Sequence, residues 1–196
     1  MRLVFHTYAA GEEIPVLDYL RNRKLQKYLN RETMAAIVAL GKLQEITALD
    51  PALPCYYATG MLEYQDYGLA DIMGTSRGQG GEFSSQLFID QGIAAVSPLN
   101  QFKVLQNMPL SFAAINFGLT GDNAVLYSAA GSLLQHANCA PGTGPVLIGA
   151  GKAHRDGSVT CGFALAERAE LATSPWLASA DEAVEMFRSW AGEVAA

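Results

Sequence analysis

The sequence predicts an α/β fold in which helices cover a mixed β-sheet. Half of its 196 residues are hydrophobic, which is enough for one sizeable core. Short apolar runs typical of buried strands alternate with segments of helical periodicity, an order that indicates layered α/β structure. We find no internal repeat, low-complexity segment or linker, and we therefore predict a single domain over residues 1–196.

The first part of the chain predicts an edge strand and a long helix. Residues 2–8 are typical of a short edge strand. Over residues 24–49 the apolar residues recur at helical spacing and form one stripe, with Leu25, Leu29, Ala36, Leu40 and Leu43. Asp50-Pro51 should end this amphipathic helix.

The next part predicts a buried strand, an irregular segment and a helix. Residues 53–58 are apolar and aromatic and end in Thr59-Gly60, as expected of a buried strand. The glycine-rich segment up to Gly81 is expected to be irregular. Its Gly78-Gln79-Gly80-Gly81 lacks the Lys and Ser/Thr of a phosphate-binding loop, so we interpret it as a flexible turn. Residues 83–93 are predicted to be helical.

The most informative stretch is a predicted helix, strand, sharp turn and second helix. Asn107 is the expected N-cap of the first helix and Gly118 its left-handed end. The stripe of this helix should contain Phe112, Ile115 and Leu119. The strand 124–127 follows, and a turn of small residues leads into the helix 131–137. A nucleophile commonly occupies such a turn, but this one contains Ala129 and Ala130.

The last part predicts two buried strands and a helix. Residues 145–150 and 159–166 are small and apolar, as buried strands require. Residues 179–191 are predicted to form an amphipathic helix, with Ser179 as N-cap and Glu182 completing a capping box. Its apolar stripe consists of Ala183, Met186, Phe187 and Trp190.

Composition restricts the possible partners. Charged residues make up only 16% of the chain, which favours either a large core or an apolar face that a partner covers. A net charge of −6 argues against a groove that follows nucleic-acid phosphates. The one basic cluster is most simply the solvated face of a helix; the alternative is a docking patch for an acidic partner such as an acyl carrier protein. The cluster consists of Arg21, Arg23, Lys24, Lys27 and Arg31.

Neither a metal site nor an export signal is expected. Cys55, Cys139 and Cys161 are far apart and no pair has metal-ligand spacing. No signal peptide and no apolar run of about 18 residues is recognised, so a cytoplasmic location is predicted, with no cofactor and no membrane insertion.

Residues 97–151 resemble the amino-terminal half of the β-ketoacyl synthases of the thiolase-like superfamily. That family carries a Ser-Pro, an Asn-Met before a helix that ends in Gly-Leu-x-Gly, a strand leading to the nucleophilic Cys, and a later Gly pair. The matching residues here are Ser97-Pro98, Asn107-Met108, Gly118-Leu119-Thr120-Gly121, Ser128-Ala129-Ala130 and Gly149-Ala150-Gly151. The resemblance implies a thiolase-like mixed sheet, about one half of the ketosynthase double fold.

Two departures from the family indicate a subunit that is not itself an enzyme. Ala130 stands where the family has its Cys, and a methyl group cannot form a thioester. The half that carries the two catalytic histidines is not matched, and His6, His136 and His154 do not replace them by context.

The resemblance therefore implies a chain length factor, a silent partner that forms a heterodimer with a catalytic β-ketoacyl synthase. Such a partner helps to set chain length in fatty-acid and polyketide biosynthesis, here of the bacterial polyene type. The expected tunnel and interface residues are Asn107, Met108, Leu110, Phe112 and Phe117.

Two alternatives remain open. One is an acyl thioester decarboxylase or hydrolase that uses Ser128, Ser132 or Cys139, although Cys139 is expected to pack as a small hydrophobe at the far end of its helix. The other is a scaffold module that binds acyl carrier protein.

Overall fold

The computed structural model describes residues 1–60, 69–94, 105–127 and 129–192. The chain forms two compact units, one made of Met1–Glu63 and Gln106–Ala196 and the other of Tyr64–Leu105. The larger unit contains the sheet, and the smaller unit contains short helices. The single domain expected over residues 1–196 stays a prediction.

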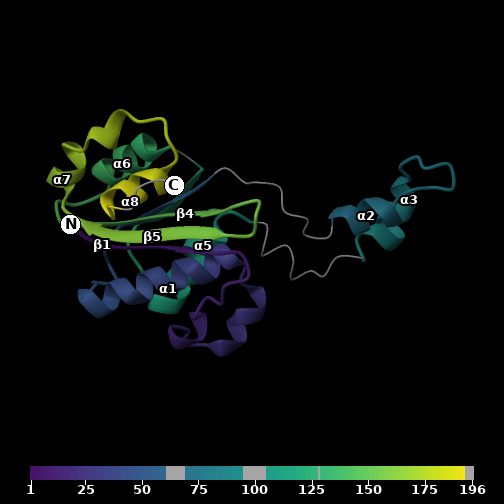
Figure 1. Ribbon diagram of the computed structural model, residues 1–196, viewed down its shortest axis with the longest axis horizontal. Coiled ribbons are helices and arrows are strands. Elements are labelled where there is room, and N and C mark those ends of the chain that lie inside the picture. Colours follow the sequence, from purple (N-terminus) through teal and green to yellow (C-terminus); the bar gives the residue numbers. More distant parts are fainter. Residues whose placement is uncertain (61–68, 95–104, 128, 193–196) are drawn as a thin grey trace. The chain divides into compact units, whose positions relative to one another are not determined.

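The larger unit is built on a five-stranded mixed sheet, which confirms the predicted α/β class (Figure 1). Its order is β1-β5-β4-β2-β3. Strand β2 pairs in parallel with both β3 and β4, whereas β5 runs antiparallel to β4 and β1. The strands are β1 (Arg2–Tyr8), β2 (Cys55–Thr59), β3 (Asn123–Tyr127), β4 (Val146–Ala153) and β5 (Val159–Ala166).

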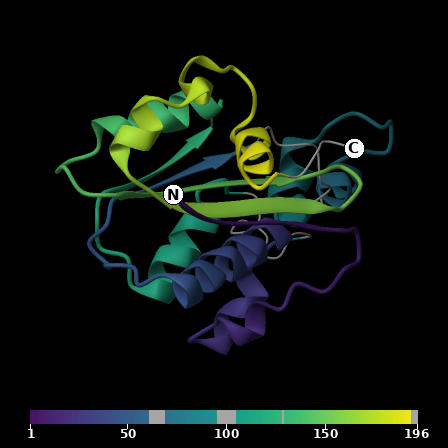
Figure 2. The same ribbon diagram turned by 60° about the vertical axis from the view of Figure 1, so that its left-hand side comes forward.

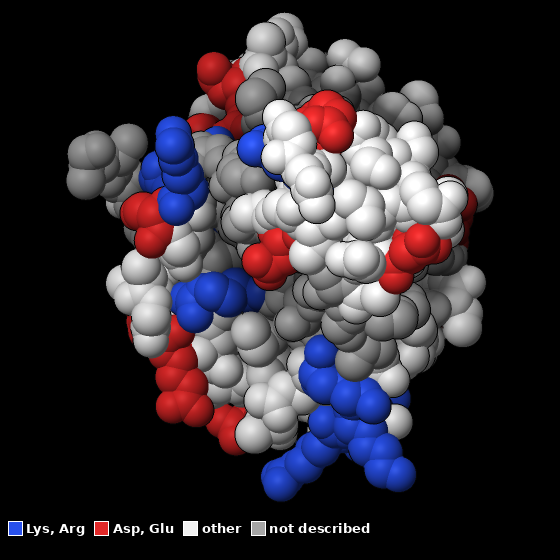
Figure 3. All heavy atoms as spheres, turned by 90° about the vertical axis from the view of Figure 1, so that its right-hand side faces the viewer, with Lys and Arg blue, Asp and Glu red and all other residues white. Residues whose placement is uncertain are grey.

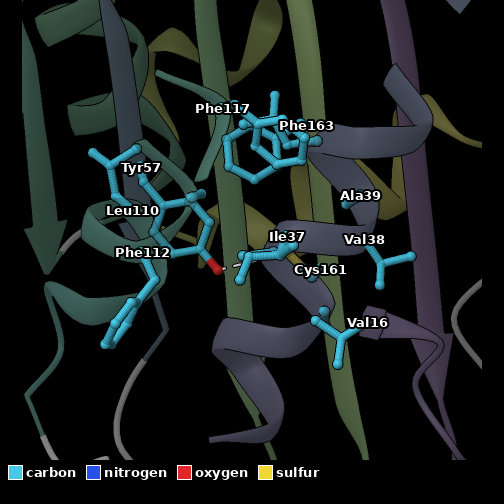
Figure 4. Packing of buried hydrophobic residues seen from close by; sticks show 14 of the residues in the cluster. Val16, Ile37, Val38, Ala39, Tyr57, Leu110, Phe112, Phe117, Cys161 and Phe163 are labelled. Carbon is cyan, nitrogen blue, oxygen red and sulfur yellow. Dashed lines mark hydrogen bonds between the residues drawn. The ribbon is translucent and has the colours of Figure 1, made fainter. Parts of the chain in front are cut away.

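Two helices cover one face of this sheet, α1 (Arg31–Ile46) and α5 (Met108–Phe117) (Figures 1 and 2). They enclose a core in which alternate strand residues meet the helices, as the twofold period of a strand requires. Figure 4 shows the side chains of this core, among which Ile37, Tyr57 and Phe163 are fully buried.

The other face is covered by α6 (Ala130–Cys139), α7 (Arg168–Ala172) and α8 (Ala183–Trp190), with the short η4 (Pro175–Ala178) beside α6. The second core lies beneath these helices. Its largest fully buried members include Leu133, Leu134, Ile148, Leu171 and Phe187. The larger unit is therefore a three-layer α/β/α arrangement.

The continuous helix expected over residues 24–49 is wrong. The chain forms the short 3₁₀ turns η1 (Val16–Asp18) and η2 (Arg23–Tyr28), and α1 begins only at Arg31. The break has a local cause, because the Asn30 side chain accepts from the Thr33 N–H at 2.8 Å and so caps a new helix.

The capping box expected at Ser179 and Glu182 is also wrong. Helix α8 begins at Ala183, its N-cap Glu182 makes no side-chain capping bond, and Ser179 instead accepts from the Asp181 N–H at 3.0 Å. A capping box is present at the start of α7, where Glu167 and Glu170 satisfy each other's backbone N–H groups.

The smaller unit contains α2 (Leu69–Thr75), α3 (Ser85–Leu87) and the single π-helical turn η3 (Phe88–Gly92). The helix predicted at 83–93 is present as α3 and η3. The segment up to Gly81 was expected to be irregular, and this is wrong for the part that forms α2. Among the described residues of this unit, only Ser76 and Gly92 are buried.

Candidate functional site

The three parallel strands end at one edge of the sheet, and this edge is the candidate site. Thr59 at the end of β2 is aligned with Tyr127 of β3 and with Gly151 of β4. Ligand sites of open α/β sheets lie outside the carboxyl ends of the strands. Helix α6 starts shortly after β3, and Glu182 at the start of α8 forms an isolated bridge with Ala129.

The turn that would carry a nucleophile is closed by the chain itself. Ala130 is fully buried, and its N–H donates to the Asp181 carbonyl at 2.8 Å. The N–H of Gly131 donates to the Ser179 carbonyl at 3.1 Å. An oxyanion hole needs such amides aimed at the substrate. Here both amides are already hydrogen-bonded to the segment 179–181.

Side chains from β4 and α8 also cover this edge. The Lys152 Nζ lies 2.7 Å from the Glu182 Oε2 in a half-buried ion pair. The Lys152 stem packs over Gly60, where an added Cβ would approach it to 2.9 Å. The charged groups of Lys152 and Glu182 at this end of the sheet thus bind each other.

The two described nucleophiles of the enzymatic alternative, Ser132 and Cys139, are not paired with a base. Ser128 lies outside the described residues. Ser132 is half-buried on α6, and the His136 Nδ1 lies 2.9 Å from its backbone oxygen. Cys139 is exposed at the end of α6, so the packing expected for it is wrong. In the described part of the chain, neither Ser132 Oγ nor Cys139 Sγ is hydrogen-bonded to an imidazole.

The expected tunnel residues on α5 fall into two groups. Leu110, Phe112 and Phe117 are only 2%, 8% and 7% exposed and lie in the core between α1 and the sheet (Figure 4). Asn107 is exposed, and it precedes the helix without a side-chain capping bond. Met108 is half-buried at the first position of α5. The structure therefore leaves Asn107 accessible, whereas Met108 is partly buried and packs against the core.

One residue of α5 departs from the expected stripe. The spacing groups Ile115 with Phe112 and Leu119, but its side chain is 69% exposed. The helix is apolar on nearly every side, so spacing alone could not distinguish its buried face.

A buried polar cluster, which sequence reasoning missed, lies between α1 and the strands. The Tyr57 hydroxyl donates to Glu32 Oε1 at 3.0 Å, and the Thr59 hydroxyl donates to the same oxygen at 3.3 Å. Cys161 Sγ lies 3.6 Å from the Tyr57 oxygen (Figure 4). Glu32 is next to the start of a helix, where an acid is ordinarily solvated.

Burial controls the ionisation of this cluster. Desolvation raises the pKa of Glu32 to about 7, although the hydrogen bonds from Tyr57 and Thr59 act to lower this pKa. Burial also raises the pKa of Tyr57 and of the Cys161 thiol, so both groups are neutral near pH 7. The cluster can therefore exchange one proton near neutral pH, at Glu32.

Two other kinds of feature are absent from the described ranges. These residues contain no group of three or more His, Cys, Asp or Glu side chains arranged to hold a metal ion. Among the helices that the structure describes, none is both long and apolar enough to cross a membrane.

Comparison with known proteins shows the fold but no family. No family model and no curated protein sequence matches the chain. Among solved structures, it is similar to one chain of a complex of a type II polyketide synthase acyl-carrier protein with its ketosynthase bound to the hexaketide. The TM-score is 0.54 and the identity 12%, over 81% of this chain and 52% of that chain. This chain thus spans about half the length of the solved chain.

Proposed function

We propose that this protein is a catalytically silent, ketosynthase-like subunit. It pairs with an active β-ketoacyl synthase and helps to shape its acyl tunnel, and hence chain length, in polyene-type polyketide biosynthesis. The observation that carries the proposal is the turn at Ala130. The position that resembles the nucleophile of the family carries a buried methyl group, and its amide is bonded to Asp181. Such a turn can hold an interface strand but cannot form a thioester.

The exposed edge of the sheet supports pairing. In the described part of the chain, β3 has a strand neighbour on one side only, β2. Tyr127 at its end is 55% exposed, and Ala124, Val125 and Leu126 are half-buried. Edge strands with apolar residues are usually covered, and a strand from a partner would continue the ladder. The charged fraction of 16% also fits a chain with a covered apolar surface.

The start of α5 supports the role in the tunnel. Leu110 and Phe112 fasten the helix to its own core, and Met108, which is partly buried against that core, lies at the start of the helix. A long side chain held on a fastened helix can close a neighbouring tunnel by steric exclusion. Met108 and Asn107 are therefore the residues that we assign to the acyl tunnel, with Leu110, Phe112 and Phe117 positioning them.

The pairing can be tested by co-expression with an active β-ketoacyl synthase that has an intact Cys and both histidines. We expect a one-to-one complex on size-exclusion chromatography with light scattering. Tyr127→Glu, which places a charge at the edge strand, should dissociate the complex, whereas Tyr127→Phe should retain it. Unchanged pairing of Tyr127→Glu would contradict the assignment of β3 as the interface.

The silent character is tested at the turn itself. Ala130→Cys restores the thiol, but the amides of residues 130 and 131 remain bonded to Asp181 and Ser179. We therefore expect no labelling of this thiol by an acyl thioester, measured by intact-protein mass spectrometry. Rapid acylation of the variant, beyond that of the wild type with its exposed Cys139, would refute the proposal that the site is closed.

A further inference from the structure

The first turn of α1 is fastened to the rest of the larger unit by three consecutive side chains. The Asn30 side chain caps the helix. The Arg31 guanidinium donates to the backbone oxygens of Ala9 and Glu12, each at 2.9 Å, and so holds the loop that follows β1. Glu32 reaches into the core, where it is only 7% exposed. A change at Glu32 therefore acts on a turn that also anchors the chain before it.

The basic cluster of residues 21–31 is not one solvated helix face as expected. Arg31 is half-buried, whereas the other four cations are exposed on η2 and the turn before it. Figure 3 shows Lys and Arg side chains projecting together at the bottom of the face in view. The four exposed cations are Arg21, Arg23, Lys24 and Lys27. Within the described ranges, Glu32 forms no ion pair with any member of this cluster.

The Glu32 carboxyl is held by neutral groups alone. Its Oε1 accepts from the Tyr57 hydroxyl at 3.0 Å and from the Thr59 hydroxyl at 3.3 Å. Gly151 lies against the same oxygen, which an added Cβ would approach to 2.9 Å. In the described part of the chain, no Lys, Arg or His side chain lies within ion-pair distance of this carboxyl. Such a carboxyl keeps its proton, because burying the anion without a cation is costly.

The elements packed against α1, which are β1, β4, β5, α5 and η1, bring no charge to Glu32. Helix α5 has no ionisable side chain. Burial raises the pKa of the Cys161 thiol on β5, and it raises the pKa of the Tyr8 hydroxyl on β1 to about 12, so both groups are neutral near pH 7. Arg2 of β1 donates to the carbonyl of the last residue of α1, at the far end of the helix. On α1 itself, Lys42 and Glu45 lie about 15 Å or more further along the helix.

Three further ionisable side chains on these elements have other surroundings. His6 on β1 places its Nε2 3.9 Å from Oε1 of Glu12. Lys152 on β4 pairs with Glu182 at the start of α8, on the opposite face of the sheet. Asp18 at the end of η1 is exposed. The protonation of Glu32 is therefore set by its burial and by its two hydroxyl donors.

We propose that Glu32 is a pH-sensitive latch of the first turn of α1. With its proton, the carboxyl stays beside Tyr57 and Thr59 and holds the turn on the sheet. When this proton passes to solvent, the carboxylate needs water that the cluster does not supply. The turn then opens, and Arg31 leaves the carbonyls of the loop after β1.

The direction of the effect follows from the solvation of the carboxyl. Burial raises the pKa of Glu32 to about 7 in the closed turn, whereas a solvated glutamate has a pKa of 4.5. Below the lower value both forms hold the proton, and the latch has its full strength. As pH rises through the higher value the closed form loses its advantage, and between pH 6 and pH 8 the population of the open turn should rise about tenfold.

The latch is tested on the full chain by hydrogen exchange at pH 6 and pH 8, measured by mass spectrometry and corrected for the intrinsic exchange rate at each pH. Amides of residues 34–36 report the first turn of α1, and amides of β5 report global unfolding. We expect the first turn to exchange faster than β5 at both pH values, with its opening about tenfold more frequent at pH 8. In Glu32→Gln this pH dependence should disappear, whereas Glu45→Gln, at an exposed position near the end of the same helix, should keep it.

The wild-type chain offers a second measurement through two buried thiols, Cys161 beside the cluster and Cys55 at the start of β2. Labelling by N-ethylmaleimide, mapped by peptide mass spectrometry, should shift toward Cys161 between pH 6 and pH 8, because the open turn uncovers Cys161 and not Cys55. Three results would each overturn the proposal: exchange at residues 34–36 that occurs only at the rate of β5, a pH dependence that Glu32→Gln retains, or a ratio of Cys161 to Cys55 labelling that stays constant with pH.

Discussion

Replacing Glu32 by Gln should remove a pH dependence from the stability of this protein. The Glu32 carboxyl is buried between α1 and the sheet, where it accepts from Tyr57 and Thr59. Glutamine keeps an oxygen acceptor at the same place but cannot ionise. The difference in unfolding free energy between wild type and Glu32→Gln, measured as a function of pH, therefore isolates the cost of a buried negative charge.

The magnitude follows from the raised pKa. The pKa of Glu32 is about 7 in the folded protein, against 4.5 for a solvated glutamate such as that of the unfolded chain. The unfolded chain therefore loses this proton first, and the free energy of unfolding falls as pH rises between these two values. This raised pKa corresponds to roughly 3 kcal/mol, most of which is lost between pH 5 and pH 8. Below the pKa that Glu32 has in the unfolded chain, both states hold the proton and this loss of stability disappears.

Urea unfolding at four pH values from about 5 to 8 measures this effect. We expect Glu32→Gln to gain roughly 2 to 3 kcal/mol of unfolding free energy relative to the wild type over that range. Glu13→Gln, at an exposed position, provides the control and should follow the wild type. A stability difference between Glu32→Gln and wild type that stays constant with pH would refute the argument that burial perturbs this carboxyl.

Three further substitutions test the packing around the site. Gly151→Ala should destabilise the protein by about 3 kcal/mol in urea unfolding, because its Cβ would overlap the Tyr57 hydroxyl. The control Gly144→Ala, in open space, should change stability by less than about 0.5 kcal/mol. Equal effects of the two substitutions would contradict the tight packing of the buried cluster. Arg168→Ala should lower the free energy of unfolding by about 2 kcal/mol, because the guanidinium donates to carbonyls at the end of α6 and in the following turn. Arg168→Lys should recover only part of this loss, and full recovery would show that charge alone matters. Asn116→Ala should cost about 2 kcal/mol and accelerate hydrogen exchange at the Arg21 amide. Unchanged exchange would exclude Asn116 as the residue that fastens the segment before η2 to α5.

The strands could be predicted from the sequence because their signal is local. The run at residues 159–166 is apolar over most of its length and coincides with β5, which is largely buried. Strand β1 at Arg2–Tyr8 likewise coincides with its prediction and lies at an edge of the sheet. For such segments, the composition of a few neighbouring residues is enough to indicate a strand and its burial.

Helix boundaries were less predictable because competing caps decide them. The apolar stripe passes from Leu29 into α1 without a change of period, although the Asn30 side chain starts a new helix there. At the other end of the chain, a Ser-x-x-Glu pattern predicts a capping box at Ser179. The bridge between Ala129 and Glu182 joins this segment to the end of β3, and such a tertiary contact overrides the local pattern.

The site itself depended on contacts between distant residues. Glu32 and Tyr57 meet only because α1 packs on the face of the sheet, and no spacing in the sequence indicates this. The turn at Ala130 could be predicted from its run of small residues. Its closure by residues 179–181 could not, because those residues are about fifty positions away.

The most direct test of the central claim is the product length made by the reconstituted pair. The active ketosynthase is assayed with this chain, with its Met108→Trp variant and with Met108→Ala, and the acyl products are measured by mass spectrometry. Ile115→Ala, at the exposed position on the same helix, serves as control. We predict shorter products with Met108→Trp, longer products with Met108→Ala and unchanged products with the control. An identical product distribution for all four proteins, in complexes shown to be intact, would contradict the account.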